Sequence, residues 1–425
     1  MSNMREMKDS GIEWITEIPI AWKTKRTKYN FENHKYIPGV KAEMYERLSL
    51  TLNGVVHRSK DDADGLQPKD FLTYQLLREG ELVFKLIDLQ NVSTSRVGLA
   101  HDTGLVSPAY IILNATGEVI PEFAEKYFLM LWHREIFNAL GDNGVRSSLS
   151  ASDLLNIPIC YPSIEEQKRI VEYLNKECCE IEKLISDIEN EISILEEYKR
   201  SKVFESISFG LSGTPLKDTD SSVWNSIPEN WKLVDIKYLF EIVKRIAGKE
   251  GFDILAITQQ GLKIKDISNN EGQLASDYSG YQFVYPGDYA MNHMDLLTGW
   301  VDLSSMFGVT SPDYRVFRLR DNKNYDRTYF KYVMQCCYMC KIFYSLGQGV
   351  SNMGRWRLQT AVFNDFKIPV PPYKEQVEIG KFLDSEITQI DSIIAEKRKQ
   401  IENASNYKKS IIFEYITGKK EVPNE

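Results

Sequence analysis

Polar and basic side chains gather in short loops of this 425-residue chain, and their types suit nucleic-acid recognition. Arginine can donate two hydrogen bonds to a guanine edge, asparagine and glutamine can pair in the same way with adenine, and lysine and serine commonly bind phosphate. Taken singly, each of them is more often an ordinary solvated loop residue. The candidates in the first half are Arg58, Lys60, Lys85, Arg96, Arg146, Ser147 and Ser148. Those in the second half are Gln259, Gln260, Lys263, Asn292, His293, Gln348, Ser351, Asn352, Arg355 and Arg357.

Taken together, these loops are stronger candidates for nucleic-acid binding, because the sequence that carries them is duplicated. A segment with two tryptophans around an Ile-Pro pair opens each half, at Trp14 to Trp22 and at Trp224 to Trp231. Later landmarks also recur in the same order, among them Ser107-Pro108-x-Tyr110 and Ser311-Pro312-x-Tyr314. The loops between the landmarks differ in length and sequence. We therefore expect one scaffold, used twice, with different binding loops at equivalent places.

Each half closes on a long amphipathic stretch, at residues 165–207 and 375–416, whose apolar residues alternate by three and four. This spacing is that of a coiled coil. A helix of about 42 residues would be roughly 60 Å long and needs a partner along its length. The simplest partner is the other helix of the same chain, packed antiparallel, although pairing between two chains of a homodimer is an alternative. The predicted spacer seam contains Leu174, Ile181, Ile185, Ile188, Ile192, Leu383, Ile387, Ile390, Ile394 and Ile401.

The predicted fold class is mixed α/β (α+β), with two pseudo-repeated globular domains alternating with two long helices that form an antiparallel coiled coil. We expect an amphipathic helix in each globular domain, at residues 121–140 and 326–346. The expected segments are a first globular domain (1–163), a spacer helix (164–209), a linker (210–222), a second globular domain (223–373), a second spacer helix (374–418) and a short tail (419–425).

The sequence motifs point away from catalysis. Pro371-Pro372-Tyr373 resembles the end of the Asn-Pro-Pro-Tyr motif of amino-methyltransferases, but Val370 stands where the amide would be. No glycine-rich phosphate loop follows a strand, and the five histidines form no metal-binding or triad pattern. Cys337-x-x-Cys340 has no second ligand pair nearby, so we expect helix-packing thiols. We predict no catalytic residue and no metal site.

Composition favours a folded protein of the cytoplasm. Hydrophobic residues make up 43% of the chain, yet no apolar run is long enough to span a membrane. The six cysteines are expected to be free thiols in a reducing compartment. The net charge of −8 does not exclude nucleic acid, because the long helices hold an excess of acids and leave room for basic surfaces elsewhere.

Two further motifs carry a resemblance to a known family. An Ile-Pro strand runs into a Glu-Gln-x-x-Ile-x-x-Leu helix start in both halves, at Ile157 to Leu174 and at Ile368 to Leu383. Together with the tryptophan segments, this arrangement resembles the DNA specificity subunit of a type I restriction-modification system. The resemblance covers essentially the whole chain. It implies two target-recognition domains held apart by a helical spacer, a bipartite double-stranded DNA target, and no catalytic activity in this chain alone.

The resemblance also implies partners. Two methyltransferase (modification) subunits would dock on the chain and, through them, restriction subunits with translocase and nuclease activity. S-adenosylmethionine, ATP and magnesium would be bound by those partners, and this chain would hold no cofactor. The repeated Glu166, Gln167, Glu375 and Gln376 are the candidate docking residues, although capping of the helix dipole would equally explain the repetition of the glutamates. Two alternatives stay open: a methyltransferase or nuclease with its own activity, and a coiled-coil scaffold that binds only proteins.

Overall fold

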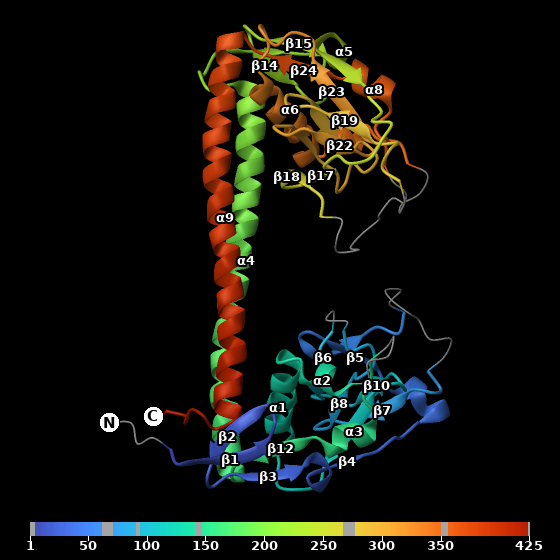
Figure 1. The fold of residues 1–425 in the computed structure, drawn as a ribbon, viewed down its shortest axis with the longest axis vertical. Helices are drawn as coiled ribbons and strands as arrows, with labels where there is room; N and C mark the ends of the chain where they lie inside the picture. Colours follow the sequence, from blue (N-terminus) through green and yellow to red (C-terminus); the bar gives the residue numbers. More distant parts are fainter. Residues whose placement is uncertain are drawn as a thin grey trace. The chain divides into compact units, whose positions relative to one another are not determined.

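The computed structural model describes residues 5–61, 71–90, 94–141, 147–266, 277–349 and 356–423. The chain divides into two compact units. Unit 1 comprises Met1–Ile188 and Lys399–Glu425, and unit 2 comprises Glu189–Arg398. Each unit therefore contains a globular domain and half of each long helix, whereas the sequence segments placed the boundaries at the helix ends. Figure 1 follows the chain through the elements of both units.

Two four-stranded sheets form the body of unit 1, each with its strands joined out of sequence order. The first runs in the order β4-β11-β8-β9: Phe31–Asn33, Ile111–Ala115, Leu82–Phe84 and Val97–Leu99. The second runs in the order β6-β5-β10-β7: Gly54–Arg58, Arg47–Thr51, Gly104–Val106 and Gln75–Leu77. Two-stranded ladders complete the unit: β1 (Met7–Ile12) with β2 (Ile15–Pro19), and β3 (Lys23–Arg26) with β12 (Pro158–Tyr161). Its helices include α1 (Pro121–His133), α2 (Ile136–Leu140), α3 (Ala151–Asn156), η1 (Thr27–Tyr29) and η2 (Gly39–Met44).

Unit 2 repeats this plan with shorter ladders. Its four-stranded sheet has the order β16-β23-β20-β21: Phe240–Val243, Arg315–Leu319, Tyr289–Met291 and Val301–Leu303. The second sheet of unit 1 is matched by two separate pairs, β17-β18 (Leu255–Thr258, Gly261–Ile264) and β19-β22 (Gln282–Val284, Gly308–Thr310). The remaining ladders are β13-β14 (Leu216–Asp218, Ser226–Pro228) and β15-β24 (Lys232–Asp235, Lys367–Val370). The shorter helices are α5 (Ile236–Leu239), α6 (Arg327–Met339), α7 (Ile342–Ser345) and α8 (Thr360–Asp365).

The residues expected to form a linker contain a strand. β13 lies within residues 210–222 and pairs with β14, as β1 pairs with β2 at the start of unit 1. The predicted linker therefore also supplies the first strand of the second copy of the N-terminal hairpin.

Each helix predicted as a single element is broken into two. α1 ends at His133 and α2 follows a left-handed Glu135 (φ 59°), while α6 ends at Met339 and α7 follows a left-handed Lys341 (φ 55°). Neither residue is glycine or asparagine, the usual residues of that conformation, so nothing in the residue types marks the breaks. Their repetition at equivalent points indicates that the shared scaffold requires the turn.

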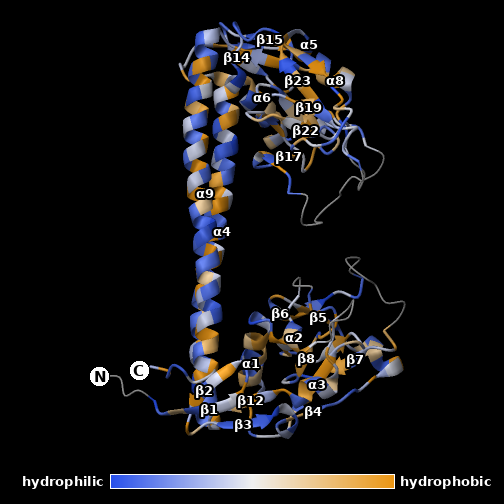
Figure 2. Cartoon of the chain, viewed as in Figure 1, coloured by the Kyte–Doolittle hydropathy of each residue, from blue (hydrophilic) through white to orange (hydrophobic). Residues whose placement is uncertain are grey.

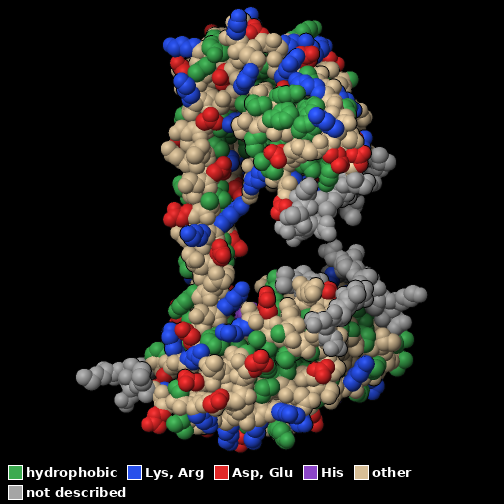
Figure 3. Space-filling model, viewed as in Figure 1, with side chains coloured by type: hydrophobic (Ala, Val, Ile, Leu, Met, Phe, Trp, Pro, Cys, Tyr) green, Lys and Arg blue, Asp and Glu red, His purple; other side chains and the backbone are tan. Residues whose placement is uncertain are grey.

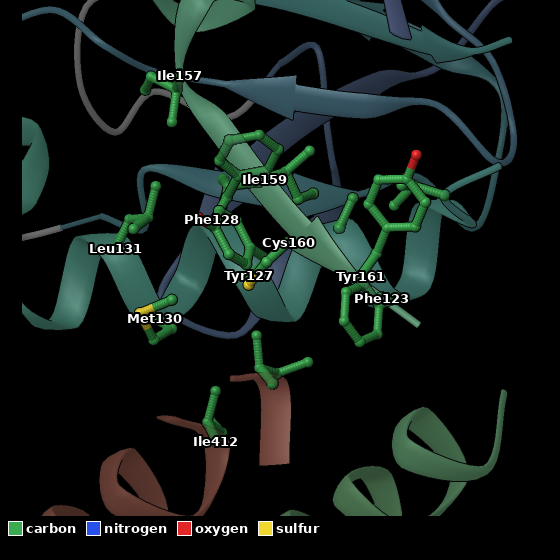
Figure 4. Close-up of a cluster of buried hydrophobic side chains, with 14 of the residues drawn as sticks. Phe123, Tyr127, Phe128, Met130, Leu131, Ile157, Ile159, Cys160, Tyr161 and Ile412 are labelled. Carbon is green, nitrogen blue, oxygen red and sulfur yellow. The ribbon is translucent and has the colours of Figure 1, made fainter. Parts of the chain in front are cut away.

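The core of unit 1 forms where α1 packs between strand β12 and the long helix α9. Figure 4 shows Phe123, Tyr127 and Phe128 of α1 close to Ile159 and Cys160 of β12, with Ile412 of α9 on the other side of α1. These side chains are all buried. Since α9 contributes to the core, the end of the chain is part of the first globular unit.

The two long helices, α4 (Ile164–Phe209) and α9 (Tyr373–Ile416), pack antiparallel within the one chain. In unit 1 Lys408 pairs with Glu182, and the hydroxyl of Tyr415 lies 3.2 Å from that of Tyr173. In unit 2 Lys397 pairs with Glu191, and Lys199 pairs with Asp391 at 2.6 Å. As the residue number rises along α4, the number of its partner on α9 falls. This order confirms that the two helices pack antiparallel within one chain. Figure 2 shows hydrophobic and hydrophilic residues alternating along both helices.

The predicted seam residues lie between the helices. Ile185 and Ile401 are half-buried, and the other eight are buried: Leu174, Ile181, Ile188, Ile192, Leu383, Ile387, Ile390 and Ile394. None of the described helices is long and apolar enough to cross a bilayer.

The repeated glutamines hold each globular domain onto its long helix. Gln167 is buried, donates to the backbone oxygens of Glu118 and Pro162, and accepts from the backbone N–H of Ile120 at 2.9 Å. Gln376 makes the matching contacts, donating to Pro371 O at 2.8 Å and accepting from Asp326 N at 2.9 Å. Burial leaves these side chains no surface for a partner. The docking prediction therefore does not fit the two glutamines, and their recurrence follows from the fold.

The neighbouring glutamates lie beside the repeated tryptophans. Glu166 is half-buried, pairs with Arg5 and accepts from the indole N–H of Trp22 at 3.3 Å. Glu375 is also half-buried and accepts from the side-chain amide of Asn230 at 3.2 Å. Both retain some exposed surface, so a docking role for them stays a prediction.

Replacing a buried glutamine should destabilise its unit. In Gln167→Ala, two carbonyls and one N–H of the first turns of α1 and α4 lose their partner, and each buried unsatisfied group costs about 1–3 kcal/mol. We expect a loss of about 3 kcal/mol or more in the free energy of unfolding, measured by urea denaturation. Glu165→Ala, at an exposed position on the same turn, is the control and should change it by less than about 0.5 kcal/mol. Equal stability of the two variants would contradict this role.

Candidate nucleic-acid interface

In unit 2 the structure brings two of the predicted loops together. The loop after β20 carries Asn292 and His293, and it lies against the segment that ends the glycine-rich stretch. The N–H of Leu296 donates to Trp356 O at 3.3 Å, and the N–H of Leu358 donates to His293 O at 3.0 Å. Gln348 and Arg357 form an isolated β-bridge at the base of the stretch, and both side chains are exposed. Groups able to recognise a base edge are thereby fixed on a braced backbone.

The hairpin β17-β18 adds a third segment to this site. The side-chain amide of Gln259 donates to Thr298 O at 3.4 Å, which ties the hairpin turn to the loop after β20. Lys263 donates to the side-chain oxygen of Gln260, so these two candidates lie side by side on the exposed end of the hairpin. All the predicted residues of unit 2 that the structure describes therefore come from three connected segments.

Unit 1 uses the same backbone connections with different side chains. The N–H of Leu89 donates to Ser147 O at 3.2 Å, and the N–H of Leu149 donates to Leu86 O at 2.9 Å. Ser148 is exposed, and Ser147 is buried. Two connections of the same kind thus join the corresponding loops in both units, although the loops differ in length and residue type.

Lys85 lies at the start of this loop in unit 1. Its ammonium donates to the hydroxyl of Thr94 at 3.1 Å, and burial followed by the nearby Arg96 charge lowers its pKa. Its half-buried side chain therefore belongs to the wall of the site.

The prediction that Arg96 contacts DNA does not fit its position. This side chain is fully buried, and its guanidinium donates to Asp88 O at 2.6 Å and Lys85 O at 3.4 Å. Burial also lowers its pKa. Arg96 braces the backbone of the loop that carries Lys85, so it supports the interface from beneath.

Arg315 supports the interface of unit 2, and sequence reasoning missed it. The buried guanidinium donates to Leu358 O at 3.0 Å and to the hydroxyl of Thr360 at 3.2 Å, and it lies 4.5 Å from the ring centre of Phe363. Burial lowers its pKa to about 10, so it stays charged at neutral pH. The strand β23 holds two arginines, the exposed Arg318 and the buried Arg315, and the place of Arg315 directly after the repeated Ser311-Pro312-x-Tyr314 was the available signal.

Arg58 and Lys60 form a separate group beside η2. Lys60 donates to the backbone oxygens of Ala42 and Glu43 at 3.1 and 3.3 Å. Both cations line a cavity of about 480 Å³ that also includes His57. The ring nitrogens of His57 lie 2.8 Å from Glu46 and 2.9 Å from Asp102, and hydrogen bonds to Asp102 and then Glu46 raise its pKa.

The remaining candidates Arg146, Ser351, Asn352 and Arg355 lie outside the described residues. On the face shown in Figure 3, lysine and arginine side chains are interspersed with acidic ones over both units. Within the described residues no cluster of histidine, cysteine and acidic side chains could hold a metal ion.

His293 makes the stability of unit 2 depend on pH. Burial, with smaller contributions from Arg315 and Arg357, lowers its pKa from 6.5 to about 4, so the folded state favours the neutral ring. Its contribution is complete above pH 6.5 and is lost as the pH falls toward 4. Between pH 7 and pH 5 we expect the unfolding temperature to fall by a few degrees less in His293→Gln than in the original chain. Identical pH profiles would contradict this assignment of His293.

Comparisons with known proteins identify relatives of this chain. Residues 228–403 match the sequence model of the type I restriction modification DNA specificity domain. The MjaVIII specificity subunit of a type I restriction enzyme from Methanocaldococcus jannaschii is 25% identical over 399 residues, which cover 86% of this chain and 88% of that protein. The matched domain is the second of two structural repeats, and this relative spans both. The chain belongs to the family of type I restriction-modification specificity subunits.

Other similarities agree with this membership. The putative MjaX specificity subunit of the same organism is 25% identical over 317 residues, covering 69% of this chain and 68% of its own length. A chain from a structure described as showing complex assembly and conformational transition of the type I R-M system shares the fold, with a TM-score of 0.67 and 15% identity. The match covers 95% of this chain and 99% of that one.

This specificity subunit is the DNA-specificity component of a type I restriction-modification complex and not its catalytic part. The three connected segments of unit 2 lie within or directly beside the matched DNA specificity domain, so that domain contains the candidate interface described above.

Proposed function

We propose that the two globular domains of this specificity subunit are target-recognition domains that read two unlike half-sites of one double-stranded DNA target. The observation that carries the proposal is the pair of equivalent loop connections, Leu89 to Ser147 and Leu296 to Trp356, on scaffolds of the same plan. The exposed side chains there differ, with Ser148 in unit 1 and Gln348 and Arg357 in unit 2. Because base edges are distinguished by donor and acceptor pattern, unlike side chains favour unlike half-sites.

The two long helices act as a spacer that fixes the distance between the half-sites. The functional segments we propose are target-recognition domains at residues 1–163 and 223–373, joined by spacer helices at 164–209 and 374–418. A seam of isoleucine and leucine that is buried at eight of the ten predicted positions supports this role, since a well-packed pair of helices resists bending and changes length only by whole residues. The two half-site centres should lie about one turn of DNA apart, about 34 Å, so that both face the same side of the duplex.

The catalytic steps belong to the partners. We propose two methyltransferase subunits, one for each repeat, which bind S-adenosylmethionine, and restriction subunits that use ATP and magnesium in the cytoplasm. This chain supplies the DNA sequence information, and the scaffold's twofold repetition supplies two equivalent positions for the partner.

This division of labour has a direct test. The purified chain is incubated with DNA and labelled S-adenosylmethionine, alone and after co-expression with the modification subunit. We expect methyl transfer above background only in the co-expressed complex. Transfer by the isolated chain would mean that it carries a catalytic site of its own. A gel shift that weakens steeply between 50 and 200 mM salt, about tenfold or more, is the accompanying check for phosphate contacts.

A further inference from the structure

A short exposed motif recurs in the two units, outside the candidate nucleic-acid interface. Lys35-x-Ile37-x-Gly39 in unit 1 has its counterpart in Lys244-x-Ile246-x-Gly248 in unit 2. Both glycines adopt a left-handed conformation, with φ of 59° and 70°. Both lysines are exposed, and the isoleucines are 46% and 48% exposed. An isoleucine kept at the same exposed place in two diverged copies needs an explanation beyond the fold.

The backbone shows that the two motifs are equivalent. The residue before each isoleucine accepts a hydrogen bond from the adjacent strand: Leu76 N–H donates to Tyr36 O at 2.8 Å, and Phe283 N–H donates to Arg245 O at 2.7 Å. Tyr36 and Arg245 therefore occupy the same position, although one is aromatic and the other cationic.

The residue that contacts this position also differs between the units, and it is an arginine in unit 1 and a tyrosine in unit 2. In unit 1 the guanidinium of Arg78 lies over the Tyr36 ring, 5.6 Å from its centre. In unit 2 the guanidinium of Arg245 lies over the Tyr285 ring, 5.0 Å from its centre. The two tyrosines are 42% and 43% exposed. The units thus keep one arginine stacked on one tyrosine, while the two residues have changed places.

A buried carboxylate fixes each pair. Glu81 accepts from the backbone N–H of Arg78 at 2.7 Å, and Asp288 accepts from the backbone N–H of Tyr285 at 2.9 Å. In unit 2 Asp288 also pairs with the Arg245 guanidinium at 2.6 Å. The exposed pair therefore sits on a rigid turn, which lowers the entropy cost of binding a partner there. We call these patches the Lys-Ile surfaces, formed by Lys35, Tyr36, Ile37 and Arg78 in unit 1 and by Lys244, Arg245, Ile246 and Tyr285 in unit 2.

Their place in the fold separates these surfaces from the loops that carry Lys85 and Asn292. Glu81 and Asp288 come directly before strands β8 and β20, whereas Lys85 and Asn292 come directly after them. A strand of three residues spans about 10 Å, so the two features lie at opposite ends of the same central strand. The loops that differ between the units are at one end, and the preserved surface is at the other.

The chemistry of the surfaces suits a protein partner. An exposed isoleucine and a tyrosine ring favour burial against an apolar side chain, and aromatic and arginine residues are enriched at protein interfaces. Beside the surface of unit 2, a cavity of about 480 Å³ is lined by Arg245, Arg318 and Arg327, with Asp288 as its only acidic residue. A complementary partner would therefore present a carboxylate next to an apolar group.

We propose that the two Lys-Ile surfaces are equivalent docking sites, each for one copy of the modification subunit. This inference rests on the proposed function, in which two such subunits bind one chain. It names a partner common to both units because the same chemistry is preserved on both, while the loops at the opposite ends of β8 and β20 differ. Base recognition of unlike half-sites would not preserve one surface in this way, and the exposed isoleucine kept on both surfaces is not a group that binds phosphate.

The test uses the co-expressed complex and native mass spectrometry. Ile37→Asp and Ile246→Asp place a carboxylate where the partner offers an apolar group and an acid. We expect each single variant to lose one of two modification subunits, and the double variant to lose both. Leu184→Asp and Ile194→Asp, at exposed positions of α4, are the controls and should keep both copies. Circular dichroism confirms that each variant is folded.

A second set of variants uses the natural exchange. Tyr36→Arg or Arg78→Tyr alone destroys the stacked pair of unit 1, and each should weaken binding of one partner copy about tenfold or more. The double variant Tyr36→Arg/Arg78→Tyr recreates the arrangement of unit 2 and should restore binding to within about threefold. Because residues in contact couple energetically, restored binding would show that the stacked pair acts as a unit, and urea unfolding of each variant separates a loss of binding from a loss of stability.

The possible outcomes distinguish a failure of this inference from a failure of the proposed function on which it rests. If the unaltered complex never holds two modification subunits, the proposed function fails first. If it holds two, but the isoleucine variants also hold two, the docking sites are elsewhere and the inference is wrong. If the variants keep both partners but lose DNA affinity, the Lys-Ile surfaces belong to the DNA interface, which also overturns the inference.

Discussion

Removing one heptad from both spacer helices should change the spacing of the DNA target and leave the half-sites themselves unchanged. Deleting residues 185–191 from α4 and 399–405 from α9 preserves the period of the seam and shortens both helices by about 10 Å. This length corresponds to about 3 base pairs of DNA. We expect affinity for the original target to fall roughly 100-fold, because only one half-site can then be engaged at a time, and a target with a gap about 3 base pairs shorter to be preferred.

The two deleted segments are chosen to face each other in the helix pair. The segment 399–405 lies between Lys397 and Lys408, which pair with Glu191 and Glu182 of α4. Deleting it from only one helix would leave the facing seam unmatched and destabilise the protein, so the single deletions are the folding controls. Selection of binding sites from random DNA gives the preferred gap. An unchanged gap with unchanged affinity would show that the helices do not set the distance.

Truncating Arg357 should relax recognition at one half-site only. Its exposed side chain lies on the braced base of the glycine-rich loop, and a bidentate contact to a base is worth about 1–3 kcal/mol. In Arg357→Ala we expect binding to the preferred target to weaken by about 5- to 150-fold, with base preference lost at one or two positions of the half-site read by unit 2. The half-site read by unit 1 should be read as before.

Arg200→Ala provides the matched control for this prediction. Arg200 is an exposed arginine on α4, away from the loops that carry the candidates, and its removal changes the net charge by the same amount. Any loss of affinity in the control should be small and equal for all sequences. A uniform loss in Arg357→Ala, with the base preference intact, would mean that Arg357 binds phosphate and reads no base.

The long-range organisation of this chain was predictable because its signals are repeated and periodic. A seam alternating by three and four specifies which face of a helix is buried, and the buried positions of Leu174 and Leu383 agree with it. The recurrence of tryptophan and Ile-Pro landmarks specified two copies of one scaffold. Each of these signals depends on many residues at once, so changing one residue does not remove the signal.

Individual site residues were harder to predict because the sequence does not reveal burial. Arg96 and Ser147 were selected as polar loop residues, yet both are buried, and Arg96 bonds to backbone oxygens. Gln167 and Gln376 recur because they hold the helix starts, which a repeat alone cannot distinguish from a binding role. Arg315 was missed because it lies in a strand, where a charged residue gives no loop signal.

The exchanged Arg78 and Tyr36 pair shows another limit of reading a repeat. Matching identical residues finds landmarks, but it overlooks positions where two residues have changed places and kept their contact. The backbone hydrogen bonds of Leu76 and Phe283 confirmed that Tyr36 corresponds to Arg245. The contact was preserved where the residue identities were not.

The central claim is that this chain reads a target of two unlike halves at a fixed spacing. The most direct measurement is a genome-wide map of methylated adenines in a host that expresses the chain with its modification subunit, compared with the same host without the chain. We predict that the chain-dependent sites share two short, different motifs whose centres are separated by a constant distance of about 10 base pairs, with no base preference in the gap. A single uninterrupted motif, or the same methylation pattern without the chain, would contradict the account.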